Sequence, residues 1–308
     1  MLMVCGEALM DVFSQGATPT GLALDARVGG SPFNVAVGLA RLNQPVALLA
    51  SISTDFLGER LMQSLMAEGV DTLAVQRVDQ STTLSLVGLN AEQVPSYAFY
   101  GGHAADRQLS SAALRQLPQR LQAIHLGSYA TVVEPVAATL RLLVEQSFHH
   151  TLISLDPNVR LNVEPDVEVW QTYLRWMLPR THLLKISDED LALLLPGVSH
   201  TAFAEQALGH GVKLVVVTGG AKGAWGWNAR TQAHVGRVAV DVVDTVGAGD
   251  TFQAAMLAWL AQHDLLSPEG LESLACESLY ELLLYCANAA AITCSRRGAD
   301  MPRLHELT

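Results

Sequence analysis

Short apolar runs alternate with stretches of helical periodicity along most of the chain, and this alternation limits the possible folds more than any other feature. The apolar runs lie at residues 2–5, 46–52, 123–126, 152–155, 182–186 and 214–217. Apolar residues recur at helical spacing over residues 34–42, 58–67, 110–121, 135–148 and 202–210. Runs that are apolar throughout are typical of parallel strands covered on both faces. The sequence therefore predicts an α/β fold, with a doubly wound, mostly parallel sheet and helices on both faces.

Two regions break this alternation. Residues 12–29 and 82–100 alternate or bend without helical spacing, and the second region is predicted to form a strand at 83–89, a turn, and a return strand at 97–100. We expect a small β-sheet lid, residues 12–29 and 82–104, inserted into a main catalytic domain of residues 1–11, 30–81 and 105–308. Further along, we expect strands at 224–227 and 238–242 and helices at 249–263 and 271–292.

The composition fits one large unit with a small insertion, since half of the 308 residues are hydrophobic (50%) and can bury an extensive core. The formal net charge of -11 argues against nucleic acid or an anionic membrane as the main partner. The four cysteines lack metal-ligand spacing and lie in apolar segments. There is no signal-peptide pattern at the start and no apolar run of membrane-spanning length. We therefore expect a cytoplasmic protein with reduced thiols.

A turn of small residues, DTVGAGDTF at 244–252, leads into a long helical pattern. Gly247, Ala248 and Gly249 have little or no side chain, so the backbone N–H groups of the turn stay accessible to a ligand. The helix that follows contributes its unpaired first-turn N–H donors and the positive end of its dipole. These features predict a phosphate site. Asp250 would repel a phosphate, so we interpret it as the group that abstracts or orients the proton of an attacking hydroxyl.

A second helix start with glycines, GGSPFN at 29–34, predicts a second ligand. Taken alone, this segment could equally be an ordinary loop with Asn34 near a helix cap. Asp11 favours the binding interpretation, because it follows the first strand at the edge where open α/β sheets bind ligands. An Asp paired with an Asn is suited to holding neighbouring hydroxyl groups.

These motifs resemble those of the pfkB (ribokinase-like) family of carbohydrate kinases over nearly the whole length, and the chain is most similar to the fructokinase branch. The second family signature is matched by residues 244–250 with AAML at 254–257, and the opening half of the first by GGSPFNVA at 29–36. The chain then departs from the family pattern, because Asn43 and Ser53 replace glycines. The resemblance implies a ribokinase-like fold and transfer of the γ-phosphoryl group of ATP to a hydroxymethyl group of a small sugar, with fructose as the first choice.

The resemblance also implies roles for individual residues. Asp250 would be the base, and the N–H groups of the turn would form an anion hole for the transferred phosphoryl group. Sugar hydroxyls would be bound by Asp11, Gly30 and Asn34. The segment FYGGHAADR at 99–107 is similar to a fructokinase segment ending in Ala-Asp, which makes Asp106 and Arg107 substrate-binding candidates. Several relatives have an arginine at the position of Gly101, and Arg107 either supplies that charge or faces solvent.

Four segments resemble the family's nucleotide site: DPNVR at 156–160, KISDED at 185–190, TGGAKG at 218–223 and CANAA at 286–290. They supply the candidate residues Asn158, Arg160, Lys185, Thr218, Gly220, Gly223 and Asn288. Without the resemblance, these segments would be turns, a helix cap and a helix packing position.

Two kinds of metal ion are implied by the same resemblance. Asp190, or the adjacent Glu189, would act on Mg²⁺ through its water shell, and Asp244 with residues 293–302 would enclose a monovalent cation such as K⁺. ATP and Mg²⁺ are thus the expected cofactors.

Other functions stay open on the residues alone. The chain has neither GxxxxGK[ST] nor a GxGxxG motif that opens a helix after the first strand, which argues against a Walker A kinase or a dinucleotide enzyme. A kinase of 2-keto-3-deoxygluconate is the second choice, because Arg107 or Arg160 could meet a sugar-acid carboxylate. A ribokinase or nucleoside kinase comes third, and a catalytically inactive sugar-binding regulator is the non-enzyme alternative. An exposed apolar face on the lid predicts a homodimer.

Overall fold

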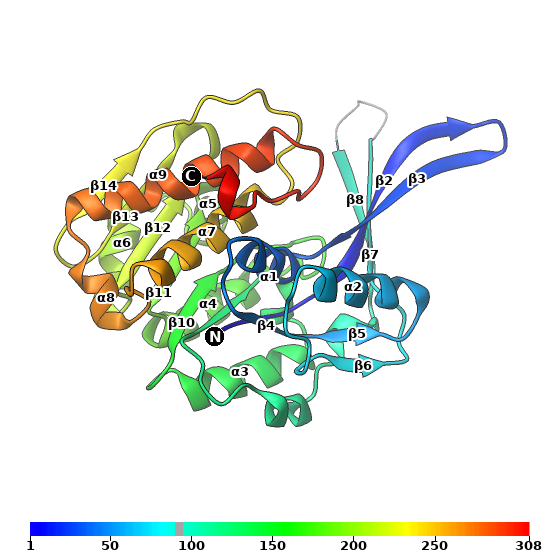
Figure 1. Cartoon of the computed structure of the whole chain (residues 1–308), viewed down its shortest axis with the longest axis horizontal. Helices are drawn as coiled ribbons and strands as arrows, with labels where there is room; N and C mark the ends of the chain where they lie inside the picture. The colour runs from blue at the N-terminus through cyan, green and yellow to red at the C-terminus, as the bar shows by residue number, and fades with distance from the viewer. Residues whose placement is uncertain (90–94, 308) are drawn as a thin grey trace.

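A mostly parallel sheet forms the centre of the molecule (Figure 1). The structure is a computed structural model that describes residues 1–89 and 95–307. From edge to edge, the eight strands are β14 (Gln232–Val235), β13 (Ala224–Trp227), β12 (Leu214–Thr218), β11 (Leu183–Ser187), β10 (Leu152–Asp156), β9 (Ala123–Gly127), β1 (Leu2–Cys5) and β4 (Val46–Leu49). Neighbours from β4 to β12 pair in parallel, whereas β13 and β14 are antiparallel. The doubly wound α/β prediction is confirmed.

Helices cover both faces of this sheet because successive side chains of each strand point to opposite sides. Leu2 and Val4 of β1 belong to one core cluster, and Met3 and Cys5 belong to another. The first cluster includes residues of α1 (Ser31–Arg41), α2 (Phe56–Ala67), α7 (Ala248–Gln262), α8 (Pro268–Ser273) and α9 (Cys276–Cys294). The second includes residues of α3 (Val136–Ser147), α4 (Val167–Met177), α5 (Asp188–Leu194) and α6 (His200–Gly209).

A smaller sheet stands to one side of the main body, and its β2–β3 hairpin extends well beyond it (Figure 1). Its strands, in order, are β3 (Gly21–Gly29), β2 (Leu9–Thr18), β7 (Leu84–Leu89) and β8 (Pro95–Tyr100). The predicted strand and return strand correspond to β7 and β8, and the turn expected between them falls on residues 90–94, outside the described residues. A third, two-stranded parallel sheet contains β5 (Ser51–Ser53) and β6 (Gln76–Val78).

Several sequence expectations about single elements are wrong. Residues 238–242 are not a strand, because no strand in the described part of the chain pairs with them and Val242 is exposed. The helix expected at 110–121 is only the 3₁₀ segment Ser111–Gln116, since Pro118 forces the preceding Leu117 into an extended conformation. The helix expected at 271–292 is divided into α8 and α9, and the Asn228 amide donates to the carbonyls of Leu271 and Leu274 at the break. The run at 46–52 forms two strands, and α4, α5 and β14 were not expected from the sequence.

No helix within residues 1–89 and 95–307 has both the length and the apolar character needed to cross a bilayer.

Candidate active site

A cleft of about 530 Å³ lies at the carboxyl ends of the central strands. It is lined on one side by Asp156, Ser187 and Thr218, the last residues of β10, β11 and β12. Phe13 and Ser85 of the smaller sheet line the other side. The cleft brings together most of the sequence-predicted residues: Asp11, Gly30, Asn34, Asn158, Arg160, Lys185, Asp190, Thr218, Gly247, Gly249 and Asp250. The site therefore lies at the sheet edge where open α/β folds bind ligands.

Asp250 lies in the first turn of α7 and is buried, with a residue exposure of 8%. Its Oδ1 accepts a hydrogen bond from the Ser31 hydroxyl (2.7 Å), and its Oδ2 accepts one from the Asn34 amide (2.8 Å). Burial raises the pKa of the Asp250 carboxyl, whereas these two hydrogen bonds and the charges of Arg160 and Lys185 favour the ionised form. The result is a carboxylate that is removed from bulk water and fixed in orientation.

The turn before α7 has the shape of an anion site. Gly247 is the N-cap, with a left-handed φ of 78°, and a Cβ added there would lie 2.5 Å from the Cβ of Ala299. Only glycine fits this position without strain. The Ala248 N–H already donates to the carbonyl of Thr245 at 3.2 Å, so the anion hole expected from all three N–H groups would depend mainly on Gly247 and Gly249.

A buried ion pair joins two central strands beside this turn. Lys185 Nζ on β11 lies 2.5 Å from Asp156 Oδ2 on β10, with side-chain exposures of 3% and 5%. The same ammonium lies 3.7 Å from the position that a Cβ on Gly249 would occupy. Lys185 therefore places its charge at the helix start while Asp156 holds it in position.

Asp11, on β2, faces Asp250 from the smaller sheet. Burial raises the pKa of Asp11 to about 6; a hydrogen bond from Ser85 opposes this rise, and the charge of Asp250 adds to it. Gly30, the N-cap of α1, has a φ of 102°, and a Cβ there would lie 2.8 Å from the Glu7 carbonyl oxygen. Glycine thus lets the start of α1 approach the end of β1 closely.

The two expected cation positions have different surroundings. Asp190 and Glu189 both line the cleft, burial raises the pKa of Asp190 to about 6, and Asp190 Oδ1 accepts a 3.3 Å hydrogen bond from the Val159 N–H. Asp244 accepts hydrogen bonds from the N–H groups of Val246 (3.1 Å) and Gly298 (2.8 Å), so it contacts the loop at residues 293–302. Within the described part of the chain, no cluster of three or more His, Cys, Asp or Glu side chains could hold a metal ion.

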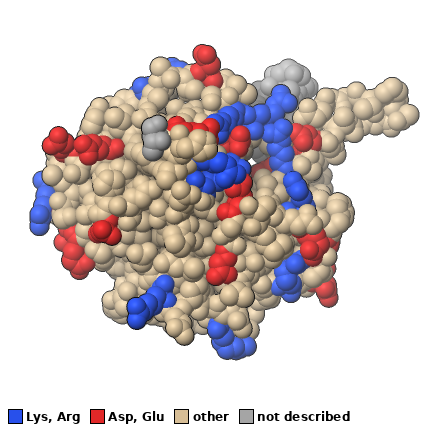
Figure 2. Space-filling model, viewed as in Figure 1, with Lys and Arg blue, Asp and Glu red and all other residues tan. Residues whose placement is uncertain are grey.

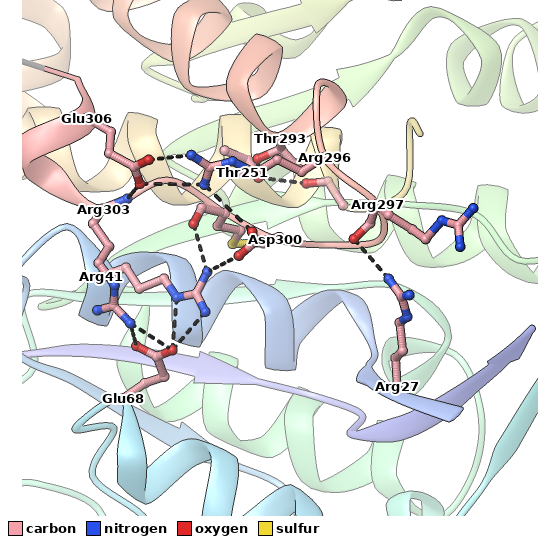
Figure 3. A network of polar contacts seen from close by, with 12 residues as sticks. Arg27, Arg41, Glu68, Thr251, Thr293, Arg296, Arg297, Asp300, Arg303 and Glu306 are labelled. Carbon is pink, nitrogen blue, oxygen red and sulfur yellow. Dashed lines mark hydrogen bonds and ion pairs between the residues drawn. The ribbon is translucent and has the colours of Figure 1, made fainter. Parts of the chain in front are cut away.

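The loop that carries Arg297 and Asp300 is anchored from both sides (Figure 3). Arg41 of α1 donates to the Met301 carbonyl (2.7 Å) and to Asp300 (2.8 Å) and also pairs with Glu68. Arg27 of β3 donates to the Arg297 carbonyl at 2.9 Å. The loop is thereby connected both to the helix that carries Asn34 and to the smaller sheet.

The remaining predicted residues lie outside the cleft lining. Asp106 is buried behind it and accepts hydrogen bonds from Thr83 and Tyr129 (2.8 Å), of which Tyr129 lines the cleft. The Arg107 guanidinium lies over the Tyr129 ring at 6.0 Å. Gly220 and Gly223 belong to the turn after β12, Asp244 and Ala248 belong to the turn that leads into α7, and Asn288 is exposed on α9.

Several polar groups in the cleft were not expected from the sequence, among them Ser31 and Glu7. Ser31 could have been identified from its spacing, because positions i and i+3 share a helix face and Asn34 is three residues further along. Glu7 is a buried carboxyl whose Oε2 has no partner among the described residues, and burial raises its pKa to about 7. The available signal was a charged residue shortly after an apolar strand, because β1 ends at Cys5.

A buried, oriented carboxylate beside a helix start with free donors, in a cleft that spans two sheets, defines an α/β phosphotransferase. The comparisons agree with this class. A model of the pfkB family carbohydrate kinases matches residues 1–306. The chain is 36% identical over 274 residues to a fructokinase of Rhizobium leguminosarum bv. trifolii, covering 89% of this chain and 84% of the relative. The chain therefore belongs to the pfkB family of carbohydrate kinases.

Solved structures show the same fold. A fructokinase from Xylella fastidiosa with bound ATP superposes with a TM-score of 0.85 at 25% identity, covering 99% of this chain and 96% of that chain. A fructokinase double mutant from Vibrio cholerae O395 with bound fructose, ADP and potassium ion superposes with a TM-score of 0.84 at 24% identity, covering 99% and 96% of the two chains.

Proposed function

We propose that the chain is an ATP-dependent fructokinase in which Asp250 is the catalytic base. The observation that carries this proposal is the position of Asp250, whose two oxygens are oriented by Ser31 and Asn34 directly behind the turn at Gly247. The similarity to the Rhizobium fructokinase supports fructose as the acceptor.

In the proposed reaction, the hydroxymethyl O–H of the sugar donates its hydrogen bond to Asp250. As the sugar oxygen forms its bond to the γ-phosphorus, the bond from that phosphorus to the β-phosphate oxygen breaks and the proton passes to the carboxylate. The N–H groups of Gly247 and Gly249 and the ammonium of Lys185 would stabilise the charge on the transferred group. No covalent intermediate with the enzyme is required.

The sugar would lie between Asp11, Gly30 and Asn34, on the side of the cleft nearest the smaller sheet. The nucleotide would lie toward Arg160, Thr218 and the second glycine turn at Gly220 and Gly223, with Asn288 beyond it. Asn158 lines the cleft, but its amide already donates to Ser31 within the site, so a contact with the nucleotide would compete with that hydrogen bond. Asp106 and Arg107 would act on the substrate only through Tyr129.

The residues present fit a divalent cation held through water. Asp190 is an acid whose pKa is raised by burial and by the neighbouring charge of Asp156, and a cation would relieve that cost. Mg²⁺ keeps several waters and is commonly bound by one or two carboxylates plus substrate phosphates, which agrees with a site that lacks a cluster of acidic ligands in the described residues. When bound, Mg²⁺ neutralises charge on the phosphate oxygens. We assign Asp190, with Glu189 next to it, to this role and Asp244 with its loop to a monovalent cation such as K⁺.

A kinase of 2-keto-3-deoxygluconate is the second candidate, because Arg160 lines the cleft and could pair with a sugar-acid carboxylate. The test is a panel of fructose, 2-keto-3-deoxygluconate, ribose and a nucleoside, with ADP release and the phosphorylated product measured for each. A kcat/KM highest for fructose supports the proposal. Sugar binding without ADP release would instead favour an inactive regulator.

We further propose that residues 12–29 and 82–104 act as a lid on the catalytic domain and that two chains associate through it. The exposed side chains of Leu22 (66%) and Leu24 (53%) on β3 support this, and the outer part of the hairpin carries no coloured charge in the view of Figure 2. A cytoplasmic location is proposed as well, because all four cysteines are unpaired and two of them are buried. Light scattering at several concentrations tests the dimer.

A further inference from the structure

Ser31 is the first residue of α1 and has no role in the proposal above other than its contact with Asp250. Its hydroxyl donates to Asp250 Oδ1 at 2.7 Å. The Asn158 amide in turn donates to Ser31 Oγ at 2.7 Å. A continuous hydrogen-bond chain thus leads from the loop after β10, through the start of α1, to the first turn of α7.

The direction of this chain is fixed by the chemistry of its members. Since the Asn158 NH₂ group is a donor, Ser31 Oγ must accept from it. The single hydroxyl hydrogen of Ser31 is then free to point at Asp250. Asp250 Oδ2 is held separately by Asn34, so both oxygens have a fixed donor. Each oxygen keeps a second lone pair, which leaves room for the O–H of a bound sugar.

The chain also affects which protonation state of Asp250 is stable. Burial favours the neutral acid, and hydrogen bonds donated to the carboxylate favour the charged base. The charged groups around it are Asp11 of β2, Arg160 of the loop after β10 and Lys185 of β11, and Lys185 is already paired with Asp156. Ser31 and Asn34, in contrast to these charged groups, donate hydrogen bonds directly to the carboxylate oxygens of Asp250.

We propose that Ser31, held by Asn158, is a positioning residue that keeps Asp250 ionised and aimed at the acceptor hydroxyl. This role rests on the proposed function of Asp250 as the base. Asn158 would then act on Asp250 indirectly, through its hydrogen bond to Ser31, whether or not it also contacts the nucleotide.

The main test compares the pH dependence of kcat/KM for wild type, Ser31→Ala and Ser31→Thr, with the sugar that the wild type phosphorylates. The acidic limb is the fall in kcat/KM at low pH that accompanies protonation of Asp250. We expect Ser31→Ala to move this limb to higher pH, because a hydrogen bond to a charged group is lost, and to lower kcat/KM by about 10- to 100-fold at pH values below the wild-type limb. The loss should shrink as the pH rises. Ser31→Thr keeps the hydroxyl and should keep the wild-type limb. Ser199→Ala is the matched control, since Ser199 is an exposed helix N-cap on α6 away from the cleft, and its profile should equal that of the wild type.

A second test addresses the connection to Asn158, which has a left-handed φ of 43° that glycine adopts without strain. Asn158→Gly should shift the acidic limb in the same direction as Ser31→Ala, by a smaller amount. The double variant should shift it no further than Ser31→Ala alone, because both changes interrupt one chain. Additive shifts, or a rise in the KM for ATP with an unchanged limb, would contradict the relay through Ser31.

A readout independent of turnover separates this proposal from the function itself. Carbon-13 NMR of labelled Asp carboxyls, with Asp250→Asn used to assign the signal, gives the pKa of Asp250 directly. A higher pKa in Ser31→Ala than in wild type supports the proposal even if fructose is not the substrate. An unchanged pKa together with an unchanged acidic limb would overturn it, whereas an absence of any sugar phosphorylation by the wild type would overturn the proposed function.

Discussion

The buried pair between Lys185 and Asp156 gives the sharpest test of how the structure holds its site. In Lys185→Met, the Asp156 carboxylate would stay in the core between β10 and β11 without its counter-ion. Removing one partner of a fully buried pair typically costs about 3–5 kcal/mol of unfolding free energy, because the remaining charge is left uncompensated. With both side chains nearly inaccessible, we expect a loss in that range, measured by urea denaturation at neutral pH.

The double variant Lys185→Met/Asp156→Leu separates the structural role from the catalytic one. With both charges gone, most of the stability should return, since an apolar pair of similar size can replace a buried ion pair at little cost. Activity should not return, because the ammonium beside the Gly247 turn is still missing. A single variant that loses less than about 1 kcal/mol, or a double variant that recovers turnover, would refute this reasoning.

Three further outcomes are expected. Burial raises the pKa of Glu7 to about 7 in the folded chain, against an ordinary value of 4.5, so the folded state binds the proton more tightly than the unfolded state. The contribution of Glu7 to the free energy of unfolding therefore falls as the pH rises between these two values. Glu7→Gln should be more stable than wild type by up to about 3 kcal/mol near pH 8 and by little near pH 4, as measured by denaturation at both pH values. Gly247→Ala should lower kcat/KM by about 100-fold or more and lower the free energy of unfolding by about 1–3 kcal/mol. The reason is that the added Cβ would overlap Ala299 and that the φ of residue 247 is left-handed. An unchanged kcat/KM would show that the turn is not an anion site. Asp244→Ala should weaken any activation of turnover by K⁺, measured by titrating KCl against an NaCl control; the same activation in both proteins would exclude Asp244 from a cation site.

The parts of the site that depend on local chain geometry could be predicted from the sequence. The turn at Gly247 and the carboxylate of Asp250 are three residues apart. A turn of small residues before a helix indicates an anion-binding site, because its backbone N–H groups are accessible. Asp11 was expected to follow the first strand directly, but it lies within β2 of the smaller sheet, which still brings it to the cleft. The buried parallel strands from β1 to β12 likewise followed from their apolar runs, because a strand covered on both faces is apolar throughout.

Features that arise from contacts between distant segments could not be predicted in this way. Asn158 contacts Ser31 across 127 positions of sequence, and Ser31 contacts Asp250 across 219. Neither spacing leaves a mark in the local pattern. Residues 238–242 alternate as a strand would, but among the residues that the structure describes they have no partner strand, and strand formation requires one. The helix α4, by contrast, has apolar residues at helical spacing, namely Trp170, Tyr173, Leu174 and Met177. It was not expected from the sequence because its aromatic and β-branched residues have a low helix propensity.

The central claim is that Asp250 removes the proton of the sugar hydroxyl. The most direct measurement is the kcat of Asp250→Asn with fructose and ATP, alongside the fructose dissociation constant. Asparagine has nearly the same shape, and the Asn34 amide can turn over to accept from it, so the fold and fructose binding should persist. We predict a kcat lower by about three orders of magnitude or more with little change in binding. A kcat within about tenfold of wild type would contradict the account.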